Sequence, residues 1–167
     1  MRKGSIVDIF YAMSILFVIA ICIIIYAFFN GLIMGSFITS FGNNTAMNAS
    51  LQKVQTATTN FYNNFNYGFL FIYFIMLISI AALDYFVYTH PIFLPLTLII
   101  QFFSIFYSMI LANAYWYFIN SSTLFQAIAN QFFIVTFMMK NLPFFDVIYC
   151  GVVNLVMYMT KRGQPRY

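Results

Sequence analysis

The sequence predicts an all-α integral membrane protein, a helical bundle of about four transmembrane helices with one short interfacial or re-entrant helix. Of the 167 residues, 63% are hydrophobic and only 6% are charged, whereas about 25% of the residues in a soluble domain are charged. The chain has no Glu, and its only acids are Asp8, Asp84 and Asp146. Several apolar runs are long enough to cross a hydrocarbon core of about 30 Å. We expect one membrane domain over residues 1–167.

The first expected span covers residues 5–34. Its apolar run exceeds the core of a signal peptide, which is about 7 to 15 residues long, and it lacks an A-x-A cleavage site. We therefore expect a retained helix. Near its end, Gly31 and Gly35 form a G-x-x-x-G pair, a spacing that lets helices approach closely in lipid. The pair predicts a helix–helix contact, within the chain or between copies, or alternatively a flexible helix exit.

Residues 36–66 are rich in Asn, Ser, Thr and Gln, and Gly42 followed by two asparagines is typical of a turn. We expect this segment to be the one sizeable extramembrane loop, in which residues 46–61 could form a polar helix. The second span, residues 67–88, ends before Pro91 because the residue before a proline is disfavoured in helical conformation. The third, residues 92–118, tolerates prolines in its first turns, and the short connection predicts an antiparallel hairpin.

Residues 121–140 combine apolar residues at helical spacing with interleaved amides, after a serine that can cap a helix. This amphipathic segment is expected to lie at the interface or to re-enter the membrane. A full crossing would raise the count to five spans. The last span, residues 143–160, opens at Pro143, and Asp146 is interpreted as a first-turn carboxylate favoured by the helix dipole.

Polar residues near and within the spans have different expected roles. Asn113 and Asn154 lie deep enough to predict hydrogen bonds between helices. Gln101 is expected nearer the interface, in contact with water. Asp84 and His90 flank the second hairpin and are expected in a solvated turn.

Basic residues gather at the two ends of the chain, and residues 161–167 form a basic tail. The positive-inside rule then predicts that both termini are cytoplasmic, which requires an even number of spans and leaves Lys53 and Lys140 on the other side. With Lys53 alone in the loop, no specific nucleic acid binding is expected. The terminal cations are expected to contact lipid headgroups or a capsid, namely Arg2, Lys3, Lys161, Arg162 and Arg166.

Motifs for catalysis are missing from the sequence. It has a single His, no Ser/His/Asp grouping, no Cys-x-x-Cys and no Gly-rich phosphate loop. We expect no enzyme activity, no cofactor and no metal site. Cys22 and Cys150 lie in apolar runs, where a thiol behaves as a small hydrophobic group.

The order of features over residues 55–163 suggests a family. A polar loop leads to a span ending at Asp84, the turn Thr89-His90-Pro91, a second span, then Asn141-Leu142-Pro143 opening a last span with a Lys161-Arg162-Gly163 tail. This order resembles small membrane proteins encoded beside the capsid genes of tailless icosahedral viruses, including phages, that carry an internal lipid membrane.

The resemblance implies a structural role in the internal bilayer of a virion, after insertion into the host cytoplasmic membrane. It also implies partners: the lipid bilayer, further copies in a homo-oligomer or multicopy assembly, and capsid or vertex proteins. Two other functions fit a small, charge-poor bundle. One is a phage holin or other pore-forming lysis protein, and the other is an accessory subunit of a bacterial membrane complex.

Overall fold

The computed structural model describes residues 7–41, 44–87 and 93–162, apart from side chains near several helix ends. Every regular element in these ranges is a helix, which confirms the predicted fold class. The helices, in chain order, are α1 (Val7–Phe41), α2 (Thr45–Val87), α3 (Phe93–Asn120), α4 (Thr123–Gln131), α5 (Phe133–Lys140) and α6 (Leu142–Arg162).

Three helices contain stretches long and apolar enough to cross a membrane, of 33 residues in α1, 33 in α2 and 24 in α3. Helices α5 and α6 pass the same test together, but they are bent by 67° where they meet. Four spans, as predicted, are reached when this bent pair counts as one. The bend follows from the sequence, because Pro143 lacks an N–H and the carbonyl of Asn141 accepts bonds from Phe144 and Phe145 instead.

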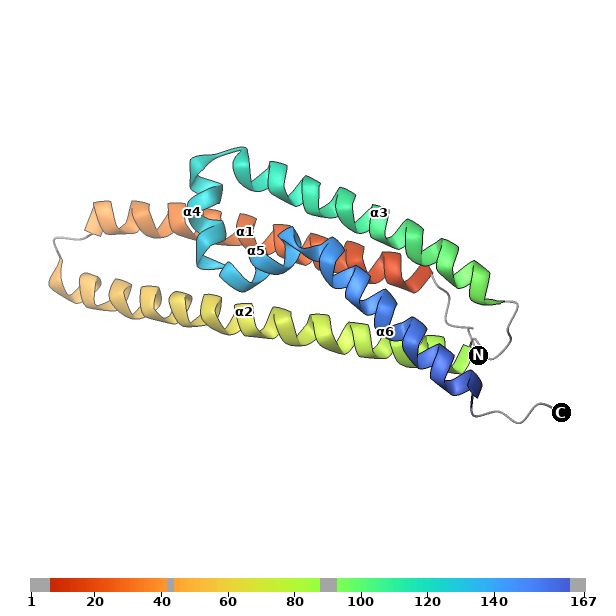
Figure 1. Ribbon diagram of the computed structural model, residues 1–167. Helices are drawn as coiled ribbons and strands as arrows, with labels where there is room; N and C mark the ends of the chain where they lie inside the picture. Colours follow the sequence, from red (N-terminus) through yellow and green to blue (C-terminus); the bar gives the residue numbers. More distant parts are fainter. Residues whose placement is uncertain (1–6, 42–43, 88–92, 163–167) are drawn as a thin grey trace.

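The long helices lie roughly side by side, with α1 and α3 running in one direction and α2 in the other (Figure 1). Helix α4 turns across the bundle where α3 ends, and α5 and α6 return toward the end where α1 begins (Figure 1). The first residues of α1 and the last of α6 therefore lie at the same end of the bundle.

The segment expected as a loop is helical where it is described, and α2 includes the polar helix that residues 46–61 were expected to allow. Helix α1 continues to Phe41 and α2 begins at Thr45, so residues 36–41 and 45–66 belong to two helices that extend beyond α3 and α4 (Figure 1). Its composition is loop-like, but its hydroxyl groups bond to carbonyls within the same helix: Ser36 to Leu32, and Thr56 to Gln52. These bonds satisfy the polar side chains without interrupting the helix.

Residues 121–140, expected as one helix, form two. Ser122 caps α4 by accepting a bond from the N–H of Leu124, as a serine cap predicts. The helix then breaks at Phe132, whose ring packs against Tyr62. The break is compensated, because the carbonyl of Ala129 accepts bonds from both the N–H of Phe132 and the hydroxyl of Thr136. Two short helices can therefore turn inside the bundle.

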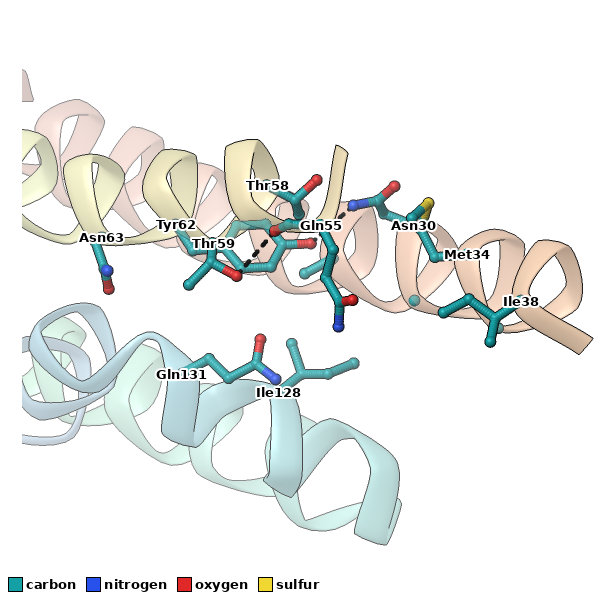
Figure 2. A pocket seen from close by; sticks show the side chains of 13 residues that line it. Asn30, Met34, Ile38, Gln55, Thr58, Thr59, Tyr62, Asn63, Ile128 and Gln131 are labelled. Atoms are coloured by element: carbon teal, nitrogen blue, oxygen red, sulfur yellow. Dashed lines mark hydrogen bonds between the residues drawn. The ribbon is translucent and has the colours of Figure 1, made fainter. Parts of the chain in front are cut away.

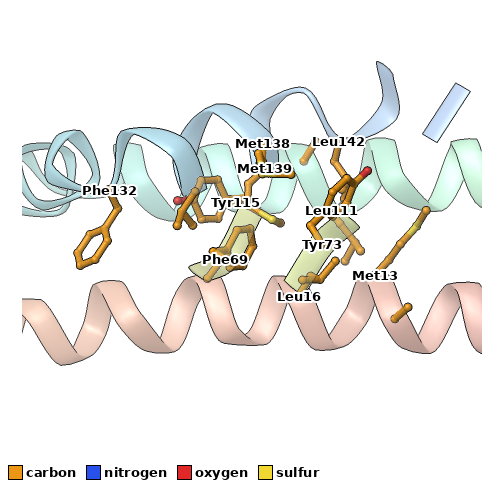
Figure 3. Close-up of a cluster of buried hydrophobic side chains, with 14 of the residues drawn as sticks. Met13, Leu16, Phe69, Tyr73, Leu111, Tyr115, Phe132, Met138, Met139 and Leu142 are labelled. Atoms are coloured by element: carbon orange, nitrogen blue, oxygen red, sulfur yellow. The ribbon is translucent and has the colours of Figure 1, made fainter. Parts of the chain in front are cut away.

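Helix α5 lies at the centre of the core (Figure 3). Its side chains Val135, Met138 and Met139 are at most 2% exposed, and they meet side chains from every long helix. The labelled members of this cluster include Leu16 of α1, Phe69 of α2, Tyr115 of α3 and Leu142 of α6 (Figure 3). The described bundle is thus organised around the short returning segment rather than around a long span.

Replacing Thr136 by Val should destabilise the bundle by about 1–3 kcal/mol, because the Ala129 carbonyl and the Tyr115 hydroxyl would each lose a buried partner. Thermal unfolding in detergent, followed by circular dichroism, measures this change. The matched control is Thr56→Val, at an exposed position in α2, which should change stability by no more than about 0.5 kcal/mol. Equal effects of the two substitutions would contradict the role given to Thr136.

Candidate functional site

The buried face of α3 is largely polar over its first half. Positions 97, 101, 104 and 108 recur at the spacing of one helix face, and all four side chains are buried. The opposite face carries exposed Phe102, Phe103 and Phe106. This arrangement is the reverse of a soluble amphipathic helix, and it suits a lipid environment, where polar side chains join helices and apolar ones contact lipid. The four inward residues are Thr97, Gln101, Ser104 and Ser108.

Polar pairs connect α3 to its neighbours along its length. The Asn154 amide of α6 donates to Gln101 Oε1 at 2.8 Å, and the hydroxyls of Ser14 in α1 and Tyr107 in α3 lie 2.6 Å apart. At the other end of α3, the Tyr115 and Thr136 hydroxyls are 3.2 Å apart. Three side chains of α3 thus form hydrogen bonds to three different helices, α6, α1 and α5.

Asp146 of α6 lies among these buried polar groups and is only 1% exposed. Ser104 Oγ donates to its Oδ2 at 3.0 Å, and Cys150 Sγ lies 3.9 Å from Oδ1. No basic side chain among those described pairs with it. Hydroxyl and thiol groups from α3 and α6 therefore hold this carboxyl group in place.

The interpretation of Asp146 as a first-turn carboxylate, explained by the helix end alone, is wrong. Helix α6 begins at Leu142, so Asp146 lies beyond its first turn, and the start of α6 packs against α5 inside the bundle. Gln101, expected in contact with water, is likewise buried, at 6% exposed. Both errors have one cause: hydropathy gives the depth of a residue along a span, but not the face of the helix that turns inward.

The two asparagines expected to join helices differ. Asn154 bonds to α3, as described, whereas Asn113 is exposed on the outer surface of α3 and bonds to no other described helix. Gly31 and Gly35 are also exposed, and a Cβ atom added to either would meet no heavy atom within 4 Å. The G-x-x-x-G pair therefore makes no close helix contact within the described chain.

The remaining sequence-predicted positions fall outside the described side chains. Arg2, Lys3 and Arg166 lie outside the described residues, as does His90. Lys161 and Arg162 belong to the last turn of α6, and Asp84 to α2, but their side chains lie outside the described part. Lys140, by contrast, is described and exposed, with its ammonium group 4.2 Å from the centre of the Trp116 ring.

An uncharged cavity of about 610 Å³ lies between α1, α2 and α4 (Figure 2). In the figure, Gln55 of α2 and Gln131 of α4 face one another across it, and Asn30 of α1 donates to the Tyr62 hydroxyl at 3.2 Å. Its lining is amide and hydroxyl groups with some apolar side chains: Ala27, Asn30, Gly31, Met34, Gly35, Ile38, Gln55, Thr58, Thr59, Tyr62, Asn63, Ile128 and Gln131.

The cavity lining can donate and accept hydrogen bonds, but it has no cation that could neutralise a phosphate. Sequence analysis missed this cavity because its lining comes from three helices distant along the chain. The concentration of Asn, Gln and Thr over residues 55–63 is its only sequence signal. No group of three or more His, Cys, Asp or Glu that could hold a metal occurs among the described residues.

Comparison with protein-family models, with curated proteins and with solved structures finds no match to this chain. Function is therefore inferred from the residues and their arrangement.

Replacing Asp146 separates a packing role from a role for its charge. Asp146→Asn retains an oxygen that accepts the Ser104 bond, so we expect stability within about 1 kcal/mol of the original. Asp146→Ala leaves Ser104 without this partner and opens a cavity, and we expect a loss of about 2–4 kcal/mol. Thermal unfolding of both variants in detergent measures the difference. A loss for Asn as large as that for Ala would show that the ionisable group itself is needed.

Proposed function

We propose that this chain is a structural membrane protein of a virion, embedded in many copies in the internal lipid bilayer beneath an icosahedral capsid. In this role it shapes the membrane and links it to the shell or its vertices. The resemblance over residues 55–163 supports the viral setting. The arrangement of polar groups in the bundle supports a structural role.

The single observation that carries the structural role is the mutual pairing of buried polar side chains. Gln101 bonds to Asn154 and Ser104 to Asp146, so the polar face of α3 is used to hold α6. A conduit for solutes needs polar groups that line a continuous open path. Here the polar groups face each other, and the described cavity with polar lining lies near the end of the bundle, between α4 and the projecting hairpin. This arrangement favours packing over transport.

The proposed orientation follows from charge. With both termini cytoplasmic, the projecting hairpin lies on the opposite side of the membrane. When such a membrane forms a vesicle inside the cell, its cytoplasmic leaflet faces outward. The basic termini would then meet headgroups or capsid proteins, and the hairpin, with Lys53 as the only basic residue over residues 36–66, would face the interior.

A second candidate is a holin or other pore-forming lysis protein. One observation favours it: the apolar stretch of α1, Ile9–Phe41, contains an 18-residue window with a mean hydropathy of 2.8 and could remain in lipid over a range of depths. Movement of the hairpin into the bilayer would bring the amides of α2 with it, as the lining of an opening between copies. This function requires that the chain alone permeabilise cells, so expression without any other viral protein tests it.

The proposed function predicts that the chain is an abundant component of lipid-containing virus particles. Quantitative mass spectrometry of purified particles should find it at many copies per particle, and removal of the lipid with detergent should release it. Recovery only from host membranes, in complex with host subunits, would contradict the proposal and favour an accessory subunit. Lysis of cells expressing the chain alone would favour the holin.

The orientation has its own test, by labelling single cysteines with a membrane-impermeant maleimide. In a chain carrying Cys22→Ser and Cys150→Ser, the substitution Gln164→Cys in the tail should be labelled from the cytoplasmic side of membrane vesicles. Thr56→Cys in the hairpin should be labelled only from the other side. Labelling of both from one side would contradict the three crossings that the proposed topology places between residue 56 and the tail.

A further inference from the structure

The end of α1 projects beyond the bundle. Phe28 of α1 contacts Phe125 of α4, which stacks on Phe118 near the end of α3. Residues 29–41 continue past this level as one unbroken helix, about 20 Å long at 1.5 Å per residue. We call residues 29–41 the α1 arm. Beyond the level of α4, the arm is accompanied by the first part of α2 (Figure 1).

The α1 arm exposes an apolar surface on the side away from the cavity. Ile33 is 54% exposed, Phe37 46% and Phe41 42%, and the rings of Phe37 and Phe41 stack. A shallow groove of about 320 Å³ runs along this side, lined by Leu32, Ile33, Ser36, Phe37, Ser40 and Phe41. These six residues are the outer face of the arm. The Ser36 hydroxyl donates to the Leu32 carbonyl of its own helix, so its donor is satisfied without water.

Lipid is a poor cover for the outer face. At the same height α2 exposes Gln52 and Lys53, and a bilayer that reached the arm would also surround these polar groups. The arm therefore lies outside the hydrocarbon core. Outside it, an apolar helix surface meets water unless another surface buries it.

Helix α2 does not bury the outer face, because it lies on the other side of the arm. The residues of α1 that face α2 and α4 are Asn30, Met34 and the two glycines, and they line the uncharged cavity. The outer face has no contact with another described helix that would remove it from solvent, and its residues stay exposed.

We propose that the outer face binds the same face of a second copy of this chain. Copies in one bilayer share one orientation, so their arms stand parallel and at equal height, and identical residues meet across a symmetry axis. The arm carries no charge between residues 29 and 41, so two such faces approach without repulsion. The surface is distinct from the G-x-x-x-G side, which faces the cavity. This inference rests on the multicopy role proposed above.

Disulfide cross-linking between copies tests the interface. In a chain carrying Cys22→Ser and Cys150→Ser, the probe is Ser36→Cys, a small-for-small change in the outer face. The matched control is Thr56→Cys on α2. The Asn30–Tyr62 bond joins α1 to α2. Ser36 is as many residues from Asn30 as Thr56 is from Tyr62, so the two probes lie at comparable heights. Both chains are placed in lipid vesicles at low density and oxidised with copper phenanthroline.

We expect at least about tenfold more cross-linked dimer from Ser36→Cys than from Thr56→Cys, because parallel arms bring identical residues within disulfide distance. Equal yields from the two probes would overturn the proposal, since they would reflect random collision. A monomeric Ser36→Cys chain would overturn it too. The cross-linking result does not depend on where the protein resides. The interface can therefore be disproved while the virion role stands, and the virion role can be disproved while the interface stands.

A charge on the outer face provides a second test that does not rely on oxidation. Phe37→Lys should lower the dimer fraction, measured by single-molecule photobleaching in vesicles, by at least about fivefold. The control Val54→Lys adds the same charge to an exposed position of α2 and should leave the dimer fraction unchanged. Circular dichroism verifies that both variants remain helical.

The same probes identify other occupants. Bimane attached at Ser36→Cys and quenched by brominated lipid would show that lipid covers the face. Cross-linking that appears only when capsid proteins are present would show that the shell covers it. Either result would overturn pairing between copies.

Discussion

In lipid, the buried polar side chains of this protein have only other groups of the protein as partners, and this constraint determines how the bundle is held together. The hydrogen bonds Ser104–Asp146 and Gln101–Asn154 attach α6 to α3. Helix α6 could not be placed by hydrophobic burial, because its apolar side chains are as well accommodated by lipid as by other helices. The polar pairs fix its position against α3.

Hydropathy and proline positions were sufficient to predict the helical class, the apolar stretches and the antiparallel course of α2 and α3 (Figure 1). The serine cap of α4 was also readable, because its chemistry is local. The burial of Asp146 and Gln101 was not predicted, since it depends on which face of a helix turns inward. A signal for it existed: Gln101, Ser104 and Ser108 recur at helical spacing between phenylalanines, and this is the pattern of an inward polar face.

The composition of residues 36–66 predicted a loop where the structure has helices, and the physical reason is a different one. Asn, Ser and Thr favour turns when their side chains compete for backbone groups, but here Ser36, Thr39 and Thr56 bond back to carbonyls of their own helices. The outcome is a stiff hairpin in place of a loop. That stiffness gives the outer face of the α1 arm a fixed height and direction, which a loop would not have.

The contact between Lys140 and Trp116 has a consequence for the lipid. Lys140 ends the short central helix, and its charge is held over a ring that lies about one helical turn before the end of α3. Both residues are exposed, and a cation beside an indole favours the headgroup region of a membrane. The pair therefore fixes the depth at which the protein lies in the membrane. In a thicker bilayer the protein would keep this depth, and the surrounding lipid would have to become thinner near the Lys140–Trp116 pair. A dense array of copies would therefore set the thickness of the membrane around it.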